Sequence, residues 1–194
     1  MARPKEFDRE EALRRAVSVF WEKGFAGTST DDLVRGMGIG RQSLYDTFGD
    51  KRQLFLSALR AYTTESLAAM LKKLRAGPTG LAAIERILID LAEAHGDARS
   101  QGCMGVNAVC ELAREDAEVR ALTETSAALL EATLRDTIDE GKAEGDIDRG
   151  IDSRAAARFL AATLSGMKVQ AKAGVPVEAL RDVAAFAVAS LRPR

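Results

Sequence analysis

Apolar residues recur along most of this chain at intervals of three and four, which is the spacing of one face of an α-helix. Near the start, one such stripe runs through Leu13, Ala16, Val17, Phe20 and Trp21. Near the end, another runs through Leu180, Val183, Ala184, Ala187, Val188 and Leu191. The chain has no alternating run of β-branched residues, the pattern typical of strands. These patterns predict an all-α protein.

Glycine, proline and capping residues divide this pattern into about nine helices. The clearest break is Gly77-Pro78-Thr79-Gly80, and Pro176 can begin the last helix because proline costs little at a helix start. The expected helices cover residues 8–23, two short segments within 28–48, then 50–76, 81–91, 103–113, 116–141, 153–167 and 176–191. The polar, glycine-bearing segment 95–102 is expected to be a loop. The helix at 50–76 would be about 35–40 Å long, enough to connect two parts of the molecule.

The segment 28–55 predicts two short helices around a turn, followed by the start of the long helix. Thr28 or Ser29 can cap the first short helix with a side-chain oxygen. Gly36, Gly38 and Gly40 cluster where the chain must reverse, and glycine tolerates the left-handed backbone that a sharp reversal needs. Six apolar residues can form a small core between the helices: Leu33, Val34, Met37, Ile39, Leu44 and Phe48.

The second short helix would expose five polar or aromatic side chains: Arg41, Gln42, Ser43, Tyr45 and Thr47. Arginine can pair bidentately with guanine and glutamine with adenine, while serine and tyrosine can reach phosphates or base edges. This inventory is typical of the recognition helix of a helix-turn-helix. We expect Arg41 and Gln42 to read bases, because they project from the start of that helix.

The order of residues in this segment resembles the DNA-binding domain of TetR (tetracycline repressor) family regulators over roughly residues 8–60. The resemblance rests on Thr28-Ser29, Leu33-Val34, Met37-Gly38-Ile39, Leu44-Tyr45, Phe48, Lys51 and Leu54. Two positions depart from the family pattern. Gly40 stands where the family usually has the serine cap of the recognition helix, and Thr47 stands where histidine or tyrosine is usual. Glycine still serves as a helix N-cap at little cost.

The resemblance implies a helix-turn-helix DNA-binding domain at 1–50 and a helical effector-binding and dimerisation domain at 51–194, connected by the helix at 50–76. It also implies that Lys51 contacts a DNA phosphate, and we expect Thr28 and Tyr45 to fix the register on phosphates; Thr47 would contribute less than the usual residue. The expected assembly is a homodimer through the last two helices, about 153–191, on an inverted-repeat operator in double-stranded DNA. A small-molecule effector of unknown identity would bind in the second domain and release the protein, most simply as a repressor.

Charge favours DNA only locally. The whole chain has a formal net charge of −1. Between Arg35 and Arg52, however, four basic residues face two acidic ones, a local balance of +2. Arg3 and Lys5 add two positive charges to an N-terminal arm. The expected electrostatic attraction to DNA is therefore modest.

A second candidate site consists of Cys103, Asn107, Cys110 and Glu111, which lie at i, i+4, i+7 and i+8 and so would share one helix face. Three interpretations stay open. The cysteines are core residues and Asn107 and Glu111 pair locally; or the face lines the effector pocket; or the two thiols, with His95, form a thiol or metal sensor. Two cysteines seven residues apart lie about 10–11 Å apart on a helix, too far for a disulfide.

The sequence offers no base, metal triad or phosphate-binding loop, so a helical redox enzyme using Cys103 and Cys110 is the weakest alternative. We expect no catalytic residue, no metal site and no cofactor. The N-terminus lacks the apolar core of a signal peptide, and no run approaches the length of about 18 apolar residues that spans a membrane. The expected location is therefore the cytoplasm, with both thiols reduced.

Overall fold

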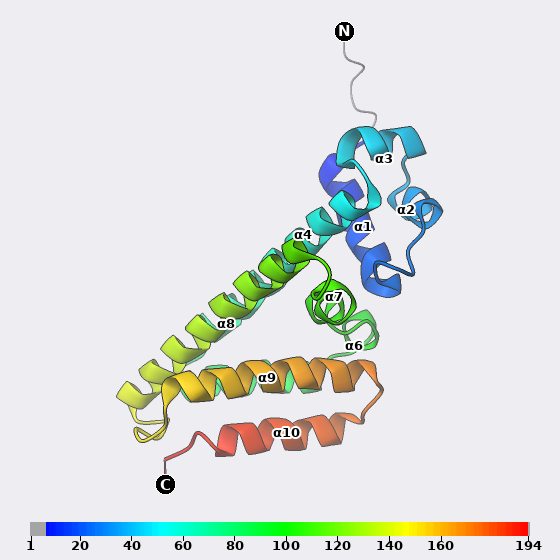
Figure 1. Cartoon of the computed structure of the whole chain (residues 1–194). Coiled ribbons are helices and arrows are strands. Elements are labelled where there is room, and N and C mark those ends of the chain that lie inside the picture. The colour runs from blue at the N-terminus through cyan, green and yellow to red at the C-terminus, as the bar shows by residue number, and fades with distance from the viewer. Residues whose placement is uncertain (1–6, 194) are drawn as a thin grey trace.

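The computed structural model describes residues 7–193, apart from the side chains of residues 97 and 98. Helices are the regular secondary structure of this part of the chain (Figure 1). They are α1 Arg9–Lys23, α2 Thr30–Met37, α3 Arg41–Phe48, α4 Lys51–Arg75, α5 Gly80–Ala92, α6 Asp97–Ser100, α7 Met104–Leu112, α8 Ala117–Glu144, α9 Ser153–Lys172 and α10 Val177–Ala189. The all-α prediction is confirmed. Arg3 and Lys5, the proposed basic arm, lie outside the described residues.

Nine of these helices have eight or more residues and correspond to the nine that the sequence predicts. The tenth, α6, is a four-residue helix inside the segment 95–102, so the prediction of a plain loop there was wrong. The reason is a tertiary contact: the guanidinium of Arg99 donates to the carbonyls of Ala92 and Val175 and holds the turn against α5 and α9. Such a contact leaves no periodic signal in the sequence.

Local capping sets where the helices begin. The Asp8 carboxylate accepts from the amides of Glu10 at 2.8 Å and Glu11 at 3.3 Å at the start of α1. Ser29 rather than Thr28 caps α2, in a capping box with Asp32. These bonds satisfy amides that have no partner inside the helix.

Two hydrophobic clusters divide the core. The first contains α1, α2, α3 and the first part of α4, and it also takes in Met104, Ala108 and Val119 from α7 and α8. The second contains the end of α4 with α5, α8, α9 and α10. Helix α4 therefore belongs to both clusters: Leu54 and Leu59 lie in the first and Leu74 in the second. The boundary at residue 50 stays a prediction.

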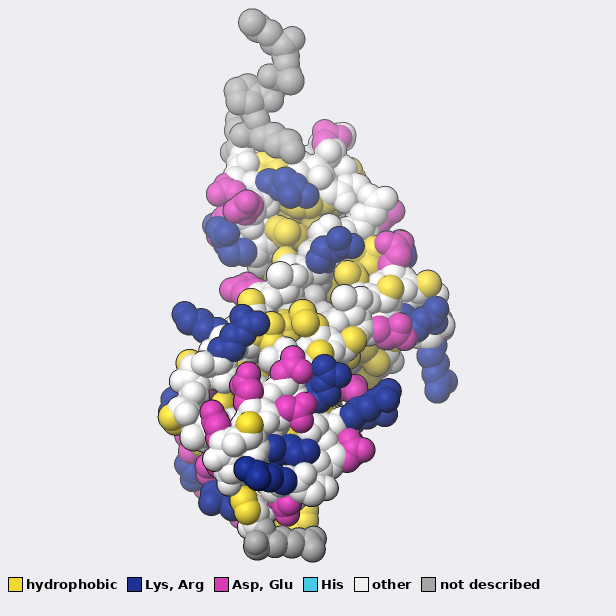
Figure 2. Space-filling view, turned by 90° about the vertical axis from the view of Figure 1, so that its left-hand side faces the viewer, with side chains coloured by type: hydrophobic (Ala, Val, Ile, Leu, Met, Phe, Trp, Pro, Cys, Tyr) yellow, Lys and Arg dark blue, Asp and Glu magenta, His cyan; other side chains and the backbone are white. Residues whose placement is uncertain are grey.

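Figure 1 shows α4 and α8 running together from the end that carries α3 toward the other end of the molecule, where α9 and α10 form an antiparallel pair. On the face shown in Figure 2, positive and negative side chains are interspersed. Within residues 7–193, no helix combines the length and the apolar character needed to span a membrane.

Candidate DNA-binding surface and effector pocket

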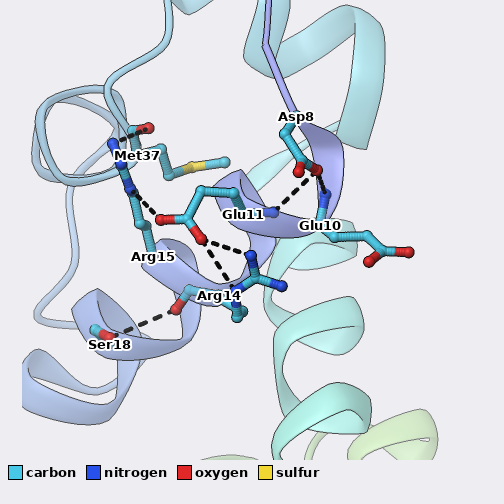
Figure 3. Close-up of polar contacts among 7 residues, drawn as sticks. All are labelled: Asp8, Glu10, Glu11, Arg14, Arg15, Ser18 and Met37. Carbon is cyan, nitrogen blue, oxygen red and sulfur yellow. Dashed lines mark hydrogen bonds and ion pairs between the residues drawn. The ribbon is translucent and has the colours of Figure 1, made fainter.

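The α2–α3 turn places α3 at the surface of the first cluster. Gly38 ends α2 with φ 69°, in the left-handed region where a side chain would be strained. Leu44 and Phe48 bury one side of α3 in the core. Arg15 of α1 holds the turn in place, since it donates to Glu11 at 2.9 Å and to the carbonyl of Met37 at 3.5 Å (Figure 3).

The opposite side of α3 faces solvent. Arg41, Gln42 and Tyr45 are exposed, and Ser43 and Thr47 are half-buried. These five side chains are thus brought together on one helix, as the sequence predicts for a recognition surface. Their contact with DNA stays a prediction.

The two proposed base-reading side chains already have acidic partners in their own domain. Arg41 Nη2 lies 2.5 Å from Asp31 Oδ1, and Gln42 Nε2 donates to Asp46 Oδ1 at 2.8 Å. Both pairs are on the surface, where an ion pair such as Arg41–Asp31 is worth about 0–1 kcal/mol and a hydrogen bond such as Gln42–Asp46 competes with water, so both are easily exchanged for base contacts.

Thr28 does not lie on this surface. It is only 1% exposed, and its hydroxyl donates to the carbonyl of Gly24 at 2.6 Å. The Thr28 side chain is buried and bonds within the α1–α2 loop, so we no longer expect it to contact a DNA phosphate. The resemblance identified the residue but carried no information on its burial.

Lys51 is half-buried at the first position of α4, with its ammonium 4.5 Å from the centre of the Phe25 ring. A cation above an aromatic face is attracted by the ring quadrupole. This contact orients a lysine that would otherwise be unfavourable at the positive end of a helix. It leaves the phosphate contact of Lys51 a prediction.

Asp32 stabilises the same domain. Lys23 at 2.6 Å, together with the hydroxyl and amide of Ser29, holds the pKa of the Asp32 carboxyl well below its usual range. The bond to Lys23 ties the end of α1 to the start of α2.

Behind the DNA-binding domain, a cavity of about 210 Å³ lies between α4, α7, α8 and α9. Its lining residues are Tyr62, Thr63, Ser66, Leu67, Met70, Cys103, Gly105, Val106, Val109, Thr123, Ser126, Ala127, Leu130, Ala161, Ser165 and Lys168. The wall is largely apolar with hydroxyl groups and one ammonium, which is the usual make-up of a small-molecule site.

The four residues expected on one helix face do not share one. Cys103 precedes α7 as its N-cap, with φ −117°, so helical spacing does not apply to it. Of the four, Cys103 alone lines the cavity. Asn107 donates to the Gln101 carbonyl at 3.3 Å and accepts from Lys172 at 3.3 Å, while Cys110 is exposed.

Glu111 has a role that none of the three interpretations included. Its carboxylate accepts from the backbone amides of Phe25 at 3.0 Å and Ala26 at 2.6 Å, in the α1–α2 loop. It therefore joins α7 to the DNA-binding domain. Among the described residues, no group of three His, Cys, Asp or Glu side chains could hold a metal, and His95 is exposed.

Sequence analysis missed the polar residues of the cavity other than Cys103: Tyr62, Thr63, Ser66, Thr123, Ser126, Ser165 and Lys168. The only signal was that Tyr62 and Ser66 are four residues apart beside the apolar stripe of α4. Burial, together with the neighbouring Cys103 thiol, raises the pKa of the Tyr62 hydroxyl, so it stays a protonated donor at neutral pH.

The cavity wall also contacts α1. Trp21 Nε1 donates to the Gly102 carbonyl at 3.2 Å, next to Cys103. The Trp21 ring meets Tyr62 edge-on, with 5.0 Å between ring centres. Trp21 therefore connects the cavity wall directly to α1 of the DNA-binding domain.

The comparisons with known proteins agree with this arrangement. The model of bacterial regulatory proteins of the tetR family matches residues 12–58, and the model of the tetracyclin repressor-like C-terminal domain matches residues 77–187. The chain belongs to the TetR family. It is a DNA-binding transcriptional regulator of that family, as the resemblance in 8–60 predicted.

Relatives of this TetR-family regulator match along nearly its whole length. It is 35% identical to the uncharacterized HTH-type transcriptional regulator YezE of Bacillus subtilis (strain 168), over 94% of this chain and 95% of YezE. It is 29% identical to the HTH-type transcriptional repressor ComR of Escherichia coli (strain K12), over 94% of this chain and 88% of ComR. Among solved structures, a cysteine mutant of the TetR family regulator CifR complexed with 26bp operator DNA is 31% identical, with a TM-score of 0.86 over 98% of this chain and all of CifR.

Proposed function

We propose that this TetR-family regulator is a repressor that binds an inverted-repeat operator as a homodimer and is released by a small molecule in the cavity. The observation that carries the proposal is a polar α3 surface joined through α7 and Trp21 to a largely apolar cavity. The similarity to ComR, a repressor, and to CifR, solved with operator DNA, supports it. A regulatory role without enzymatic activity or a cofactor, in the cytoplasm, is part of the proposal.

In the proposed complex, α3 enters the major groove. Arg41 and Gln42 read base edges after exchanging Asp31 and Asp46 for bases. Ser43, Tyr45, Thr47 and Lys51 contact phosphates, which fix the register without carrying sequence information.

The dimer would form through α9 and α10. A stripe of exposed, uncharged residues runs along α9 to its C-cap, with alternating spacings of four and three: Ala155, Phe159, Ala162, Gly166, Val169 and Ala173. On α10, Phe186 is 73% exposed. A Cβ at Gly166 would meet nothing within 4 Å in the single chain. An uncharged stripe with this spacing is typical of a helix that packs against another helix, and a second copy supplies one.

Effector control would work by population shift. A molecule that prefers one arrangement of α4 and α7 favours that arrangement by its difference in affinity. In a dimer, the two α3 helices must lie about 34–36 Å apart to enter successive major grooves on one side of DNA. A change in this separation therefore weakens binding to both half-sites together.

Selection of bound duplexes from a random pool tests this proposal. The expected result is an inverted repeat, recovered at low and moderate salt by the full-length protein. Recovery of no motif, or of a single half-site without symmetry, would contradict the proposal.

A further inference from the structure

Three titratable side chains from separate parts of the chain meet at the cavity. Tyr62 comes from α4, Cys103 from the start of α7 and Lys168 from α9. Lys168 Nζ lies 4.0 Å from Cys103 Sγ, and Tyr62 lines the same cavity close to this thiol. Among the described side chains, this thiol is the hydrogen-bond partner of Lys168.

The surroundings of Cys103 favour nucleophilic chemistry. A thiol reacts as its thiolate, which a nearby cation and the positive end of a helix both stabilise. Lys168 lies beside the Cys103 sulfur, and Cys103 is the residue at which α7 begins. Cys110 differs: it is exposed near the other end of α7 and is not part of the cavity wall.

The apolar residues of the cavity wall determine which ligands fit. Leu67, Met70, Val106, Val109 and Leu130 surround the same cavity. This lining accepts a small apolar molecule. The one cation, Lys168, can donate to an oxygen on that molecule while Cys103 faces a carbon beside it.

We propose that Cys103 is a covalent-modification site and that the effector class is small apolar α,β-unsaturated carbonyl compounds. This identifies the ligand of the proposed effector cavity, and so it rests on the proposed function. The Cys103 sulfur bonds to the β-carbon, and the electron pair of the C=C bond moves toward the carbonyl oxygen. Lys168 stabilises the enolate oxygen by hydrogen bonding, and the α-carbon then takes up the proton that the thiol released.

No oxidant or reductant is required, because the net reaction adds S–H across the C=C bond. The carbonyl oxygen and the β-carbon of such a compound are three bonds apart. This separation is comparable to the 4.0 Å between Lys168 Nζ and Cys103 Sγ. One molecule can therefore contact both groups at once.

The modification would reach the DNA-binding domain directly. Gly102, the residue before Cys103, accepts the hydrogen bond from Trp21 of α1. Tyr62, which packs on Trp21, lies close to the thiol that would be consumed. A new group on Cys103 occupies the space beside Tyr62 and displaces the contact with α1.

The test treats the full-length protein with 2-cyclohexen-1-one and follows intact mass and binding to the selected operator duplex. Cyclohexanone, which has a similar shape but no C=C bond, is the matched ligand control. The variants are Cys103→Ser, Cys110→Ser, Lys168→Met and Lys172→Met; Lys172 lies one turn further along α9. Thermal melts establish that each variant is folded, and Cys103→Ala replaces Cys103→Ser if the serine variant is not.

The expected result is one adduct on the wild type and on Cys110→Ser, and none on Cys103→Ser at the same dose. Lys168→Met should slow the reaction by at least about fivefold, since a unit charge about 4 Å away is removed, while Lys172→Met should not. The adduct should weaken duplex binding at least about tenfold. Cyclohexanone should leave the mass and the duplex binding of the wild type unchanged.

Equal modification of Cys110, equal rates for the two lysine variants, or an adduct that leaves duplex binding unchanged would each overturn the proposal. If the untreated protein binds no duplex, the proposed function fails, and the mass measurement still decides whether Cys103 is the reactive site.

Discussion

The carboxylate of Glu111 accepts a 2.6 Å hydrogen bond from the backbone amide of Ala26, 85 residues earlier in the chain. The amide of Phe25 donates to the same carboxylate at 3.0 Å. Since Gly105, Val106 and Val109 of the same helix line the cavity, Glu111 connects the cavity wall to the loop that precedes the helix-turn-helix.

Replacing Glu111 by Gln should loosen this connection. The amide side chain has one acceptor oxygen and no charge, so one of the two loop amides loses its partner. The expected loss in free energy of unfolding is about 1 kcal/mol, because the site is exposed. Hydrogen exchange should show faster exchange at Phe25 and Ala26. Glu115→Gln, just beyond α7, is the matched control; equal exchange in both variants would contradict the role of Glu111.

Arg41→Ala tests base readout. It should cost about 1–3 kcal/mol on the preferred operator and relax specificity at one base pair. Competition binding with operators altered at single positions measures both effects. A uniform loss over all sequences would place Arg41 on phosphates instead.

Lys51→Ala tests the phosphate contact. It should weaken binding to all duplexes alike and reduce the slope of log K against log salt by about one unit. Binding isotherms at several salt concentrations give this slope. Because the ammonium also stacks on Phe25, thermal melts of the variant separate a lost cation–π contact from a lost phosphate contact. An unchanged slope would remove Lys51 from the DNA site.

Phe186→Glu tests the dimer. A charge at position 186 of the proposed α9–α10 interface would have to be buried between copies, so the variant should be monomeric at concentrations where the wild type is dimeric. The fold should survive, because this side chain is 73% exposed in the single chain. Ala185→Glu is the control: it lies one turn after Arg181, which pairs with Glu93 of the same chain. Sedimentation velocity measures the assembly, and a dimeric Phe186→Glu would contradict the interface.

Asp116→Asn tests the bond between α4 and α8. Arg52 donates to Asp116 at 2.7 and 2.9 Å, and this holds the pKa of the Asp116 carboxyl below its usual range. A lowered pKa contributes stability above the pKa of the unfolded chain, near 3.9, and this stability is lost as pH falls through the folded pKa.

At pH 7, Asp116→Asn should therefore lower the free energy of unfolding by about 1 kcal/mol, while asparagine keeps the N-cap of α8. The deficit should shrink as pH falls below about 4, because the unfolded chain takes up the proton first and the wild type then loses the stability that charged Asp116 provides. Urea unfolding at both pH values measures it. A deficit that does not change with pH would mean that the Arg52 pair contributes nothing.

The helices were predictable because their signals are local. The predicted helix at 50–76 is α4, Lys51–Arg75, and the Asp50 side chain caps it. Ser29, Asp116 and Asp152 likewise cap helices within a residue or two of the predicted starts. Each cap bonds an amide two or three residues away, so its chemistry can be read from neighbouring residues.

The site was less predictable because its contacts are not local. Glu111 bonds a loop 85 residues away, and the burial of Thr28 is a property of the folded chain that its residue type does not reveal. Tyr62 and Lys168 line the cavity from α4 and α9. The apolar stripes of these helices indicated only that they pack in a core. Helical spacing placed Cys103 on a face of α7, whereas its backbone is extended before the helix begins.

Sedimentation equilibrium of the full-length protein, alone and with the selected operator duplex at low salt, shows whether two chains bind one operator. We expect a dimer that binds one duplex, two chains to each double strand. A monomer that leaves every duplex unbound would contradict this expectation.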